Sequence, residues 1–467
     1  MPLSLSDFER EALPALLEYC SIECLSPGFD DDWIENGHID AAIEMLAAWS
    51  RERQFADANV EVIRIEGRTP VLLVTVEATN TDDATIVLYG HLDKQPPLGD
   101  WSEGLSPFQP VRRDDRLYAR GVADDGYSTF SALLALEQLE IQGLAHSRCV
   151  VLIEASEESG SSDLDAYLDH LVEKLGRVEL MICLDSSALT YDRLWVTTSL
   201  RGVVHVEVTV QVLTQGRHSG LDGGVVPSSF RILRQLLERL EDSTTGRVIL
   251  PELHAEIPRE ARESAQALAE EFGAADTADI PVVSGLTLMG ENDAERILNR
   301  TWRPALAVIG MGGIPAPEIA GNVLRPFTTA SLSFRLPPSV DAQSAGEALE
   351  RALSADVPHG ALVSVRTQSA DGWAAPPSAP WLRDALESAS RRAFGHEPGY
   401  YGGGGTIPFL ASLARRYPSV QFVATGVLGP DSNAHGIDEM LDLPTAVAIT
   451  NVVSDVVVAF GHRHEQS

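Results

Sequence analysis

The chain reads Thr85-Ile86-Val87-Leu88-Tyr89-Gly90-His91-Leu92-Asp93 at the point where its architecture is clearest. A short apolar run of this kind is typical of a fully buried strand. Two later runs have the same form: Val150-Val151-Leu152-Ile153 ends in Glu154, and Met181-Ile182-Cys183-Leu184 ends in Asp185. Because ligands in open α/β sheets collect beyond the carboxyl ends of the strands, we expect these polar side chains to share one region.

Helical segments alternate with these strands. Helices are predicted near 126–142 and 163–175, between strands at 85–89, 149–154 and 180–184. This rhythm predicts an α/β domain with a mixed, helix-covered sheet. Near the N-terminus, Ser6 followed by Glu9 has the capping-box spacing and predicts the start of an amphipathic helix.

The pattern changes at Val204. From there to Val212 valine alternates with polar residues, and 331–336 alternates in the same way, which predicts two half-buried strands. Helices near 227–240 and 345–353 and a strand near 362–365 complete an α+β module. The Pro-rich 374–380 then returns the chain to the helix-strand rhythm, in segments 381–394, 420–424 and 444–460. We therefore predict an inserted domain, with boundaries 1–202, 203–372 and 373–467.

Composition excludes some classes of partner. The chain has 467 residues, of which 44% are hydrophobic, and its 68 acidic against 35 basic residues give a formal net charge of -33. Such a surface repels phosphate backbones and anionic lipids, so neither nucleic acid nor membrane is expected as a partner. We expect no secretory signal and no stretch able to span a bilayer. The four cysteines are too few for a disulfide framework, and free thiols indicate a cytoplasmic protein: Cys20, Cys24, Cys149 and Cys183.

Further acidic residues follow the same strands. Asp124 and Asp125 precede the helix predicted from Gly126, and Glu157 and Glu158 follow the strand that ends in Glu154. So many carboxylates share a small site only if cations neutralise them or several are protonated. Each residue alone has an ordinary structural explanation, such as a helix cap or a loop side chain. Together with His91 they favour Zn²⁺ or Mn²⁺, and a carboxylate bridging two ions roughly 3.5–4 Å apart is a hydrolytic arrangement.

Seven ordered motifs resemble the carnosinase branch of the dinuclear metallopeptidases, a family that also includes aminoacylase and glutamate carboxypeptidase. They are Gly90-His91-Leu92-Asp93-Lys94-Gln95-Pro96-Pro97, Tyr118 to Gly126, Glu154 to Gly160, Leu184-Asp185-Ser186, Arg217-His218-Ser219-Gly220, Gly402 to Pro408 and Asn433-Ala434-His435-Gly436. The resemblance implies a two-metal catalytic domain with an inserted ferredoxin-like lid and dimerisation domain. It is specific for the fold and the metal site, and less so for the substrate.

The resemblance also implies roles for individual residues. Asp124 would bridge two divalent ions, with zinc expected first and manganese or cobalt as alternatives. His91 and Asp185 would complete one ion, and Glu158 and His435 the other. Glu157 would be the general base, and Asp93 would hold the His91 imidazole in its metal-binding tautomer.

Four further residues of the inserted domain and its return segment match positions of the family. His218 would reach the active site of the other subunit of a homodimer to stabilise the oxyanion. Asn322 and Arg335 would bind the substrate's carboxylate or scissile carbonyl, and Thr406 would join them. The family has an acidic residue just ahead of its Gly-Gly-Ser/Thr, whereas glycine fills that place in Gly402-Gly403-Gly404-Gly405.

The favoured function is a metallodipeptidase that cleaves the amide bond of a small peptide with a free carboxylate. The alternative within the enzyme class is deacylation of an N-acyl amino acid. A transferase or ligase that runs amide chemistry in reverse would use the same site. A family member without catalysis is disfavoured because Glu157, Asp93 and all five proposed ligands are present.

Overall fold

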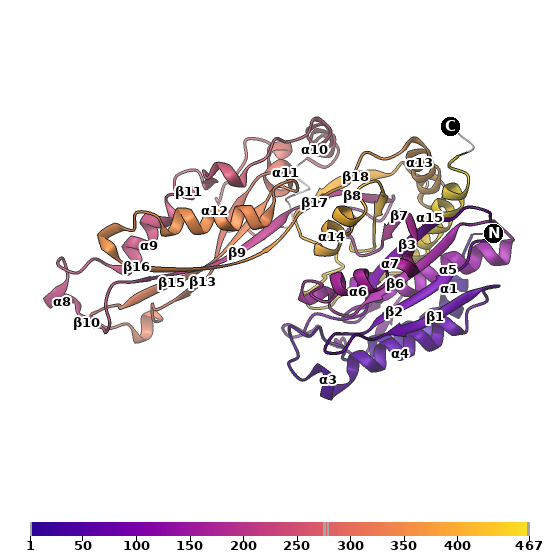
Figure 1. The fold of residues 1–467 in the computed structure, drawn as a ribbon, viewed down its shortest axis with the longest axis horizontal. Helices are drawn as coiled ribbons and strands as arrows, with labels where there is room; N and C mark the ends of the chain where they lie inside the picture. The colour runs from indigo at the N-terminus through magenta and orange to yellow at the C-terminus, as the bar shows by residue number, and fades with distance from the viewer. Residues whose placement is uncertain (1, 274–276, 278–279, 465–467) are drawn as a thin grey trace. The chain divides into compact units, whose positions relative to one another are not determined.

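The computed structural model describes residues 2–273, 277 and 280–464, which form two compact units (Figure 1). Unit 1 comprises Met1–Thr198, Ala375–Tyr400 and Ser412–Ser467, and unit 2 comprises Ser199–Ala374 and Tyr401–Ala411. Tyr401–Ala411 was assigned to the catalytic domain by the sequence, and here it groups with unit 2. The reason is local bonding, since the Thr406 hydroxyl and the Gly404 carbonyl bond to side chains of unit 2.

The largest sheet of the described chain, most of which lies in unit 1, is mixed, as the sequence predicts. Its strand order is β1-β2-β6-β3-β7-β19-β8-β17, with β18 also paired to β8. The central pairs β6–β3, β3–β7 and β7–β19 are parallel, and the pairs β1–β2 and β2–β6 are antiparallel. The strands are β1 (Ala58–Ile63), β2 (Val71–Val76), β3 (Ala84–His91), β6 (Arg148–Glu154), β7 (Arg177–Cys183), β8 (Trp195–Leu200), β17 (Trp373–Ala374), β18 (Gly399–Gly403) and β19 (Gln421–Ala424).

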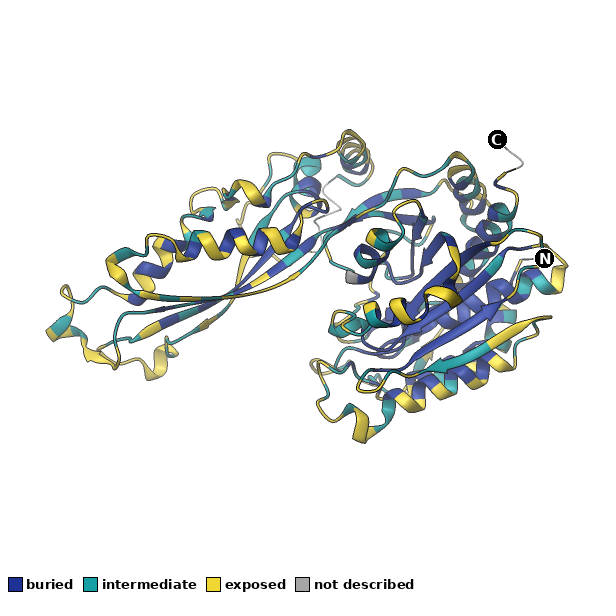
Figure 2. Cartoon of the chain, in the orientation of Figure 1, coloured by how far each residue is buried: buried dark blue, intermediate teal, exposed yellow. Residues whose placement is uncertain are grey.

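Helices surround the part of this sheet that lies in unit 1. α4 packs on β1 and β2, α5 packs on β3 and β6, and α15 packs on α5 and α13. Strand β3 is buried along its whole length, which explains its unbroken apolar sequence (Figure 2). The helices are α1 (Leu5–Glu11), α2 (Leu13–Cys20), α3 (Trp33–Asn36), α4 (His38–Arg51), α5 (Tyr127–Gln142), α6 (Leu164–His170), α7 (Val172–Leu175), α13 (Pro380–Phe394), α14 (Pro408–Arg416) and α15 (Leu443–Gly461). A small sheet joins β4 (Val111–Arg113), β5 (Arg116–Tyr118) and β20 (Met440–Asp442).

Two sequence expectations need correction in unit 1. The first helix is capped by Ser4, whose hydroxyl accepts from the Asp7 backbone N–H, so Ser6 is already inside α1 and does not cap it with Glu9. Helix α15 has a mean hydropathy of 1.7 and is long enough to cross a bilayer, contrary to the expectation of no such stretch. Because 67% of its apolar window is buried within the fold, α15 is explained as a core helix of this unit.

Unit 2 has a four-stranded antiparallel sheet in the order β13-β15-β9-β16, against which α9 and α12 pack. The predicted alternation is confirmed, because Val204, Val206, Val208 and Val210 are buried in its core. The sheet is formed by β9 (Gly202–Gln211), β13 (Ala305–Gly312), β15 (Phe327–Leu336) and β16 (Leu362–Ala370), and the packed helices are α9 (Ser229–Leu237) and α12 (Ala342–Ser354). The other elements are β10 (Arg217–His218), α8 (Ser219–Asp222), β11 (Glu241–Asp242), β12 (Arg247–Val248), α10 (Arg259–Phe272), α11 (Asp293–Thr301) and β14 (Val323–Leu324).

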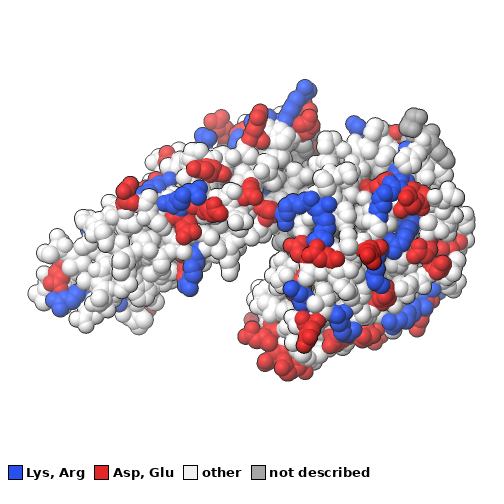
Figure 3. Space-filling model, in the orientation of Figure 1, with Lys and Arg blue, Asp and Glu red and all other residues white. Residues whose placement is uncertain are grey.

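Charged side chains of both signs are interleaved on the visible face of the molecule (Figure 3). The four cysteines are free and buried, in agreement with the sequence.

Candidate metal centre

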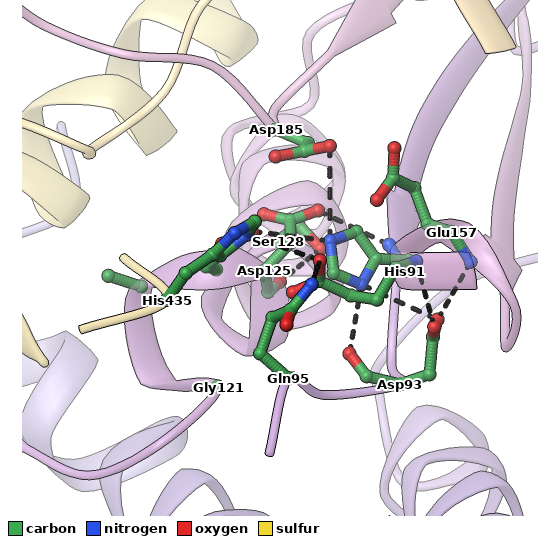
Figure 4. Close-up of polar contacts among 12 residues, drawn as sticks. His91, Asp93, Gln95, Gly121, Asp125, Ser128, Glu157, Asp185 and His435 are labelled. Carbon is green, nitrogen blue, oxygen red and sulfur yellow. Dashed lines mark hydrogen bonds and ion pairs between the residues drawn. The ribbon is translucent and has the colours of Figure 1, made fainter. Parts of the chain in front are cut away.

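Five segments of unit 1 bring polar side chains to one edge of the sheet. His91 ends β3, and the parallel neighbours β6 and β7 lead to Glu157–Ser159 and to Asp185. A turn of five residues, Val122–Gly126, carries Asp124 into the same region just before α5. His435 arrives from the loop between β19 and β20 (Figure 4). The expected meeting of strand ends is therefore observed.

Asp124 lies between two imidazoles. Its Oδ1 is 3.4 Å from His91 Nε2, and its Oδ2 is 2.9 Å from His435 Nε2. Each carboxylate oxygen thus faces a different histidine, which is the arrangement that a bridging ligand requires.

One further carboxylate stands beside each imidazole. Asp185 Oδ2 is 3.8 Å from His91 Nε2, and Glu158 Oε2 is 3.2 Å from His435 Nε2. Among the residues that the structure describes, two groups have donor atoms close enough to hold one ion: His91 with Asp124 and Glu158, and His91 with Glu157 and Asp185.

The donor set fits divalent metal. His91 Nε2 is buried and makes no hydrogen bond to any residue that the structure describes, although carboxylates face it. Two ligand atoms that are each about 2.1 Å from a tetrahedral zinc lie about 3.4 Å apart, which is close to the spacings found here. The cluster could therefore hold metal without rearranging its imidazoles.

The pKa values indicate that the cluster lacks positive charge. Burial raises the pKa of Asp185 to about 7, and burial and the neighbouring Asp124 raise that of Glu158. Hydrogen bonds to Asp124 and Glu158 raise the pKa of His435 to about 11. Carboxylates that take up protons and imidazoles that keep them mark a site that cations would neutralise.

Glu157 differs from its neighbour Glu158. Its carboxylate is within reach of His91 and Asp185, and burial, followed by the charge of Asp185, raises its pKa. Figure 4 shows its side chain directed toward the space beside His91 and Asp185.

Asp93 acts on two partners. Its carboxylate accepts from the backbone N–H groups of Glu157 and Glu158, at 3.1 and 3.0 Å. Its backbone carbonyl is 3.1 Å from His91 Nδ1, while its carboxylate is 3.5 Å away. The imidazole is thus oriented mainly by the backbone of Asp93, and the carboxylate fixes the turn that carries both glutamates.

Three contacts around the cluster were not singled out from the sequence. Gln95 Nε2 donates to Glu158 Oε2 at 2.8 Å, and Asp125 Oδ2 accepts from the His91 backbone N–H at 3.2 Å. Glu439 forms a buried ion pair with Arg120 at 2.7 Å. All four residues lie in or beside the quoted motifs, but nothing local in the sequence separates them from loop residues.

The predicted site residues of unit 2 lie in two separate places. Arg335 Nη1 donates to Thr406 Oγ1 at 2.9 Å. Asn322 lies beside His218 instead, because its carbonyl accepts from Ser219 and β10 pairs with β14. Strand β15 separates the groups, and its eight steps from Phe327 to Arg335 span roughly 26 Å. The structure therefore does not bring Asn322 and Arg335 together within one chain.

The chain is similar to known proteins of one peptidase family. The model of peptidase family M20/M25/M40 matches residues 87–459. A cysteinylglycine-S-conjugate dipeptidase from Corynebacterium striatum is 28% identical over 378 residues, which are 80% of each chain. A Cys-Gly metallodipeptidase from Saccharomyces cerevisiae is 25% identical and aligns over 81% of this chain and 79% of its own. The crystal structure of human carnosine dipeptidase 1 is similar to this chain with a TM-score of 0.75, at 21% identity and with coverage of 98% of this chain and 97% of that chain.

The structural likeness supports the fold, and the family match covers the ordered motifs, the inserted unit and the carboxylate cluster. The resemblance inferred from the motifs is confirmed. The chain belongs to peptidase family M20/M25/M40 and is an enzyme of the metallopeptidase class.

Proposed function

We propose that this enzyme hydrolyses the amide bond of dipeptides at a centre of two divalent metal ions, with zinc as the first candidate. The observation that carries the proposal is Asp124, whose two oxygens face the imidazoles of His91 and His435. The names of the relatives, a cysteinylglycine-S-conjugate dipeptidase and a Cys-Gly metallodipeptidase, favour a dipeptide as the substrate.

The ligands divide between the two ions by proximity. His91 and Asp185 would hold one ion, Glu158 and His435 the other, and Asp124 both. Such a pair of ions, when bound, would polarise the scissile carbonyl and lower the pKa of the attacking water.

Glu157 would carry the proton. Its carboxylate would accept a proton from the attacking water and then donate it to the leaving nitrogen, which requires a group that is not consumed as a ligand. A pKa raised by burial and by Asp185 suits this role, because a carboxylate poised nearer neutrality transfers a proton in both directions.

His218 would stabilise the oxyanion. Its Nδ1 accepts from the Gly220 backbone N–H at 3.1 Å, so in the neutral ring the proton is on Nε2. An exposed imidazole with a fixed Nε2–H donor is suited to a developing negative charge.

The separation of His218 and Asn322 from Arg335 and Thr406 supports a homodimer. A single site that uses both groups needs them from two copies, since β15 keeps them apart in one copy. Apolar side chains around the His218 hairpin are exposed, as an interface would require: Leu221 76%, Val225 83% and Ile319 77%. Four free buried cysteines are in keeping with a reducing, cytoplasmic setting.

A substrate panel tests the proposal. Metal-reconstituted enzyme would be offered dipeptides and N-acyl amino acids, with Glu157→Ala as the blank. Cleavage of dipeptides by the wild-type enzyme, but not by Glu157→Ala, supports the proposal. Cleavage of N-acyl amino acids alone would replace it with deacylation, and silence on both with metal bound would contradict hydrolysis.

A further inference from the structure

Lys94, which directly follows Asp93, carries a fully buried ammonium group close to the metal centre. The ammonium binds the C-terminal end of helix α2, where a positive charge is favoured by the helix dipole. Nζ donates there to three backbone carbonyls, those of Tyr19 at 3.0 Å, Cys20 at 3.3 Å and Ile22 at 2.8 Å. Lys94 therefore connects the end of α2 to the segment that follows β3.

Carbonyls and an aromatic ring, rather than a carboxylate, surround this ammonium. Nζ lies 4.3 Å from the centre of the Tyr19 ring and 5.7 Å from that of Phe108. Among the residues that the structure describes, no carboxylate lies within ion-pair distance of Nζ. A buried ammonium is unfavourable unless its donors have partners, and its three donors match the three carbonyls. The Lys94 side chain is therefore held in one position.

Lys94 and Tyr19 also support the turn that carries Asp124. A Cβ on Gly121, just before this turn, would lie 2.6 Å from Lys94 Cγ, and a Cβ on Gly126, at its end, would overlap the Tyr19 ring. The Gly126 backbone N–H donates to the Gly121 carbonyl at 3.0 Å, which closes the turn. Because nothing larger than hydrogen fits at either glycine, the turn lies directly on these two side chains.

Backbone contacts fix the residues on both sides of Asp93. The Leu92 carbonyl accepts from the Tyr19 hydroxyl at 2.8 Å and from Cys24 Sγ at 3.2 Å. The Lys94 backbone N–H donates to the Cys24 carbonyl at 2.9 Å. The chain that follows α2 thus holds Leu92 and Lys94 in place, and with them the direction of the Asp93 carboxylate.

We propose that Lys94 is a positioning residue of the metal centre. Its ammonium holds the end of α2 and its alkyl chain supports the Asp124 turn. Asp93 then keeps the backbone N–H groups of Glu157 and Glu158 in place. Lys94 acts only through these segments. The inference rests on the proposed two-metal function and adds a residue, outside the ligand set, on which the geometry of that centre depends.

The first test needs no metal. Lys94→Met removes the ammonium and keeps an unbranched side chain, so the segment after β3 loses its connection to α2. Hydrogen exchange of the metal-free protein would be followed by mass spectrometry of peptides spanning 155–162. The backbone N–H groups of Glu157 and Glu158 should exchange about tenfold faster than in wild type, because Asp93 no longer holds them firmly.

Arg463→Met is the matched control. It also replaces a buried cation by methionine, but Arg463 pairs with Asp82, just before β3, at the end of that strand opposite to His91. Arg463→Met is therefore expected to leave the exchange of 155–162 close to wild type.

The second test measures zinc affinity by competition with a chelator. Lys94→Met is expected to bind zinc about 10- to 100-fold more weakly, as changes behind metal ligands do. At saturating zinc, kcat for a dipeptide should stay below wild type while KM stays close to it, because Glu157 is displaced and no substrate contact is removed. Arg463→Met should keep the wild-type zinc affinity, kcat and KM.

Tyr19→Phe keeps the test open if Lys94→Met does not fold. It removes only the hydrogen bond to the Leu92 carbonyl and keeps the ring beside Lys94, so zinc affinity should fall by about fivefold, the effect of one neutral hydrogen bond.

Two results would overturn the inference. One is exchange and zinc affinity in Lys94→Met equal to those of Arg463→Met. The other is wild-type zinc affinity in Tyr19→Phe when Lys94→Met does not fold. Either would reduce Lys94 to a role in folding alone. Absence of zinc binding or of dipeptide hydrolysis in the wild type would instead count against the proposed function.

Discussion

Glu157 and Asp124 make different contacts, in keeping with the different roles proposed for them. Asp124 uses both oxygens on imidazoles, whereas Glu157 is held through its backbone N–H by Asp93 and leaves its carboxylate available. A ligand has to stay on the metal, and a base has to exchange a proton. In the proposed mechanism, metal binding and proton transfer are therefore assigned to different side chains.

Glu157→Gln keeps the shape of the side chain and removes the base. We expect kcat to fall by about 10² to 10⁴, the usual contribution of a general base, with the metal content unchanged. Steady-state kinetics and elemental analysis of the same sample measure both quantities. Loss of metal in this variant would mean that Glu157 is a ligand.

Glu439 is a positioning residue for Asp124. Its carboxylate accepts from Arg120 and from the backbone N–H groups of Gly121, Ala123 and Asp124. Arg120 also donates to the Gly436 carbonyl, beside His435. The buried ion pair between Arg120 and Glu439 thus connects the segment before Asp124 to the segment after His435.

Glu439→Gln is expected to weaken metal binding by about 10- to 100-fold, as changes behind metal ligands do. It should also cost about 3 kcal/mol of unfolding free energy, since Arg120 keeps a buried charge. Glu137→Gln is the control, because the Arg53–Glu137 pair is similarly buried and contacts none of the cluster. Equal metal affinity in both variants, measured by competition with a chelator, would reduce Glu439 to a purely structural role.

The candidate ligands could be predicted because each follows a local signal, either the end of an apolar strand or the start of a helix. Glu439 could not, since its partner Arg120 is 319 residues away and only the fold makes them a pair.

At the level of elements, regular patterns gave reliable predictions. The alternation in β9 and the apolar runs of β3, β6 and β7 appear as expected, because burial on one face or on both leaves a direct trace in the sequence. Helices α10 and α11 were not predicted. Each buries only two or three residues, so its apolar stripe is short.

Helix α15 is anchored at its C-terminal end by Arg463. The guanidinium is 5% exposed and pairs with Asp82, which lies just before β3, and with Glu179 in β7. Burial alone would raise the pKa of Asp82, but the hydrogen bonds from Arg463, the Ala84 backbone and Ser147, together with the charge of Arg463, outweigh burial and lower the pKa to about 2. The ion pair therefore stabilises the fold above the unfolded pKa of 3.8, and this contribution is lost as the pH falls toward 2.

Arg463→Met should lower the unfolding free energy by about 2 kcal/mol at pH 7, since the pair is only partly shielded from water. The difference from wild type should shrink as the pH falls from about 4 toward 2. Urea unfolding at several pH values measures it. Arg64→Met, which breaks an exposed pair, serves as the control with little expected effect, and a pH-independent difference for Arg463→Met would contradict the assignment to Asp82.

At the level of the whole molecule, the separation of the two groups of unit 2 residues supports the proposed homodimer. His218→Ala and Glu157→Ala homodimers should each be nearly inactive. Mixed dimers carry one site with both residues intact if His218 acts across the interface, so activity should recover to about a quarter of wild type at equal mixing, since half the dimers are mixed and each has one complete site. Absence of recovery in dimers shown to be mixed would place His218 outside the partner's site.

The two-metal centre bridged by Asp124 underlies every other proposal, and metal stoichiometry tests it. Metal bound per chain would be measured together with dipeptide hydrolysis for wild type and Asp124→Asn, after stripping and reloading with zinc. We expect two ions per chain and full activity in wild type, with loss of tight binding of both ions and of activity in the variant. A single ion per active chain, or an Asp124→Asn enzyme that keeps two ions and normal turnover, would contradict the account.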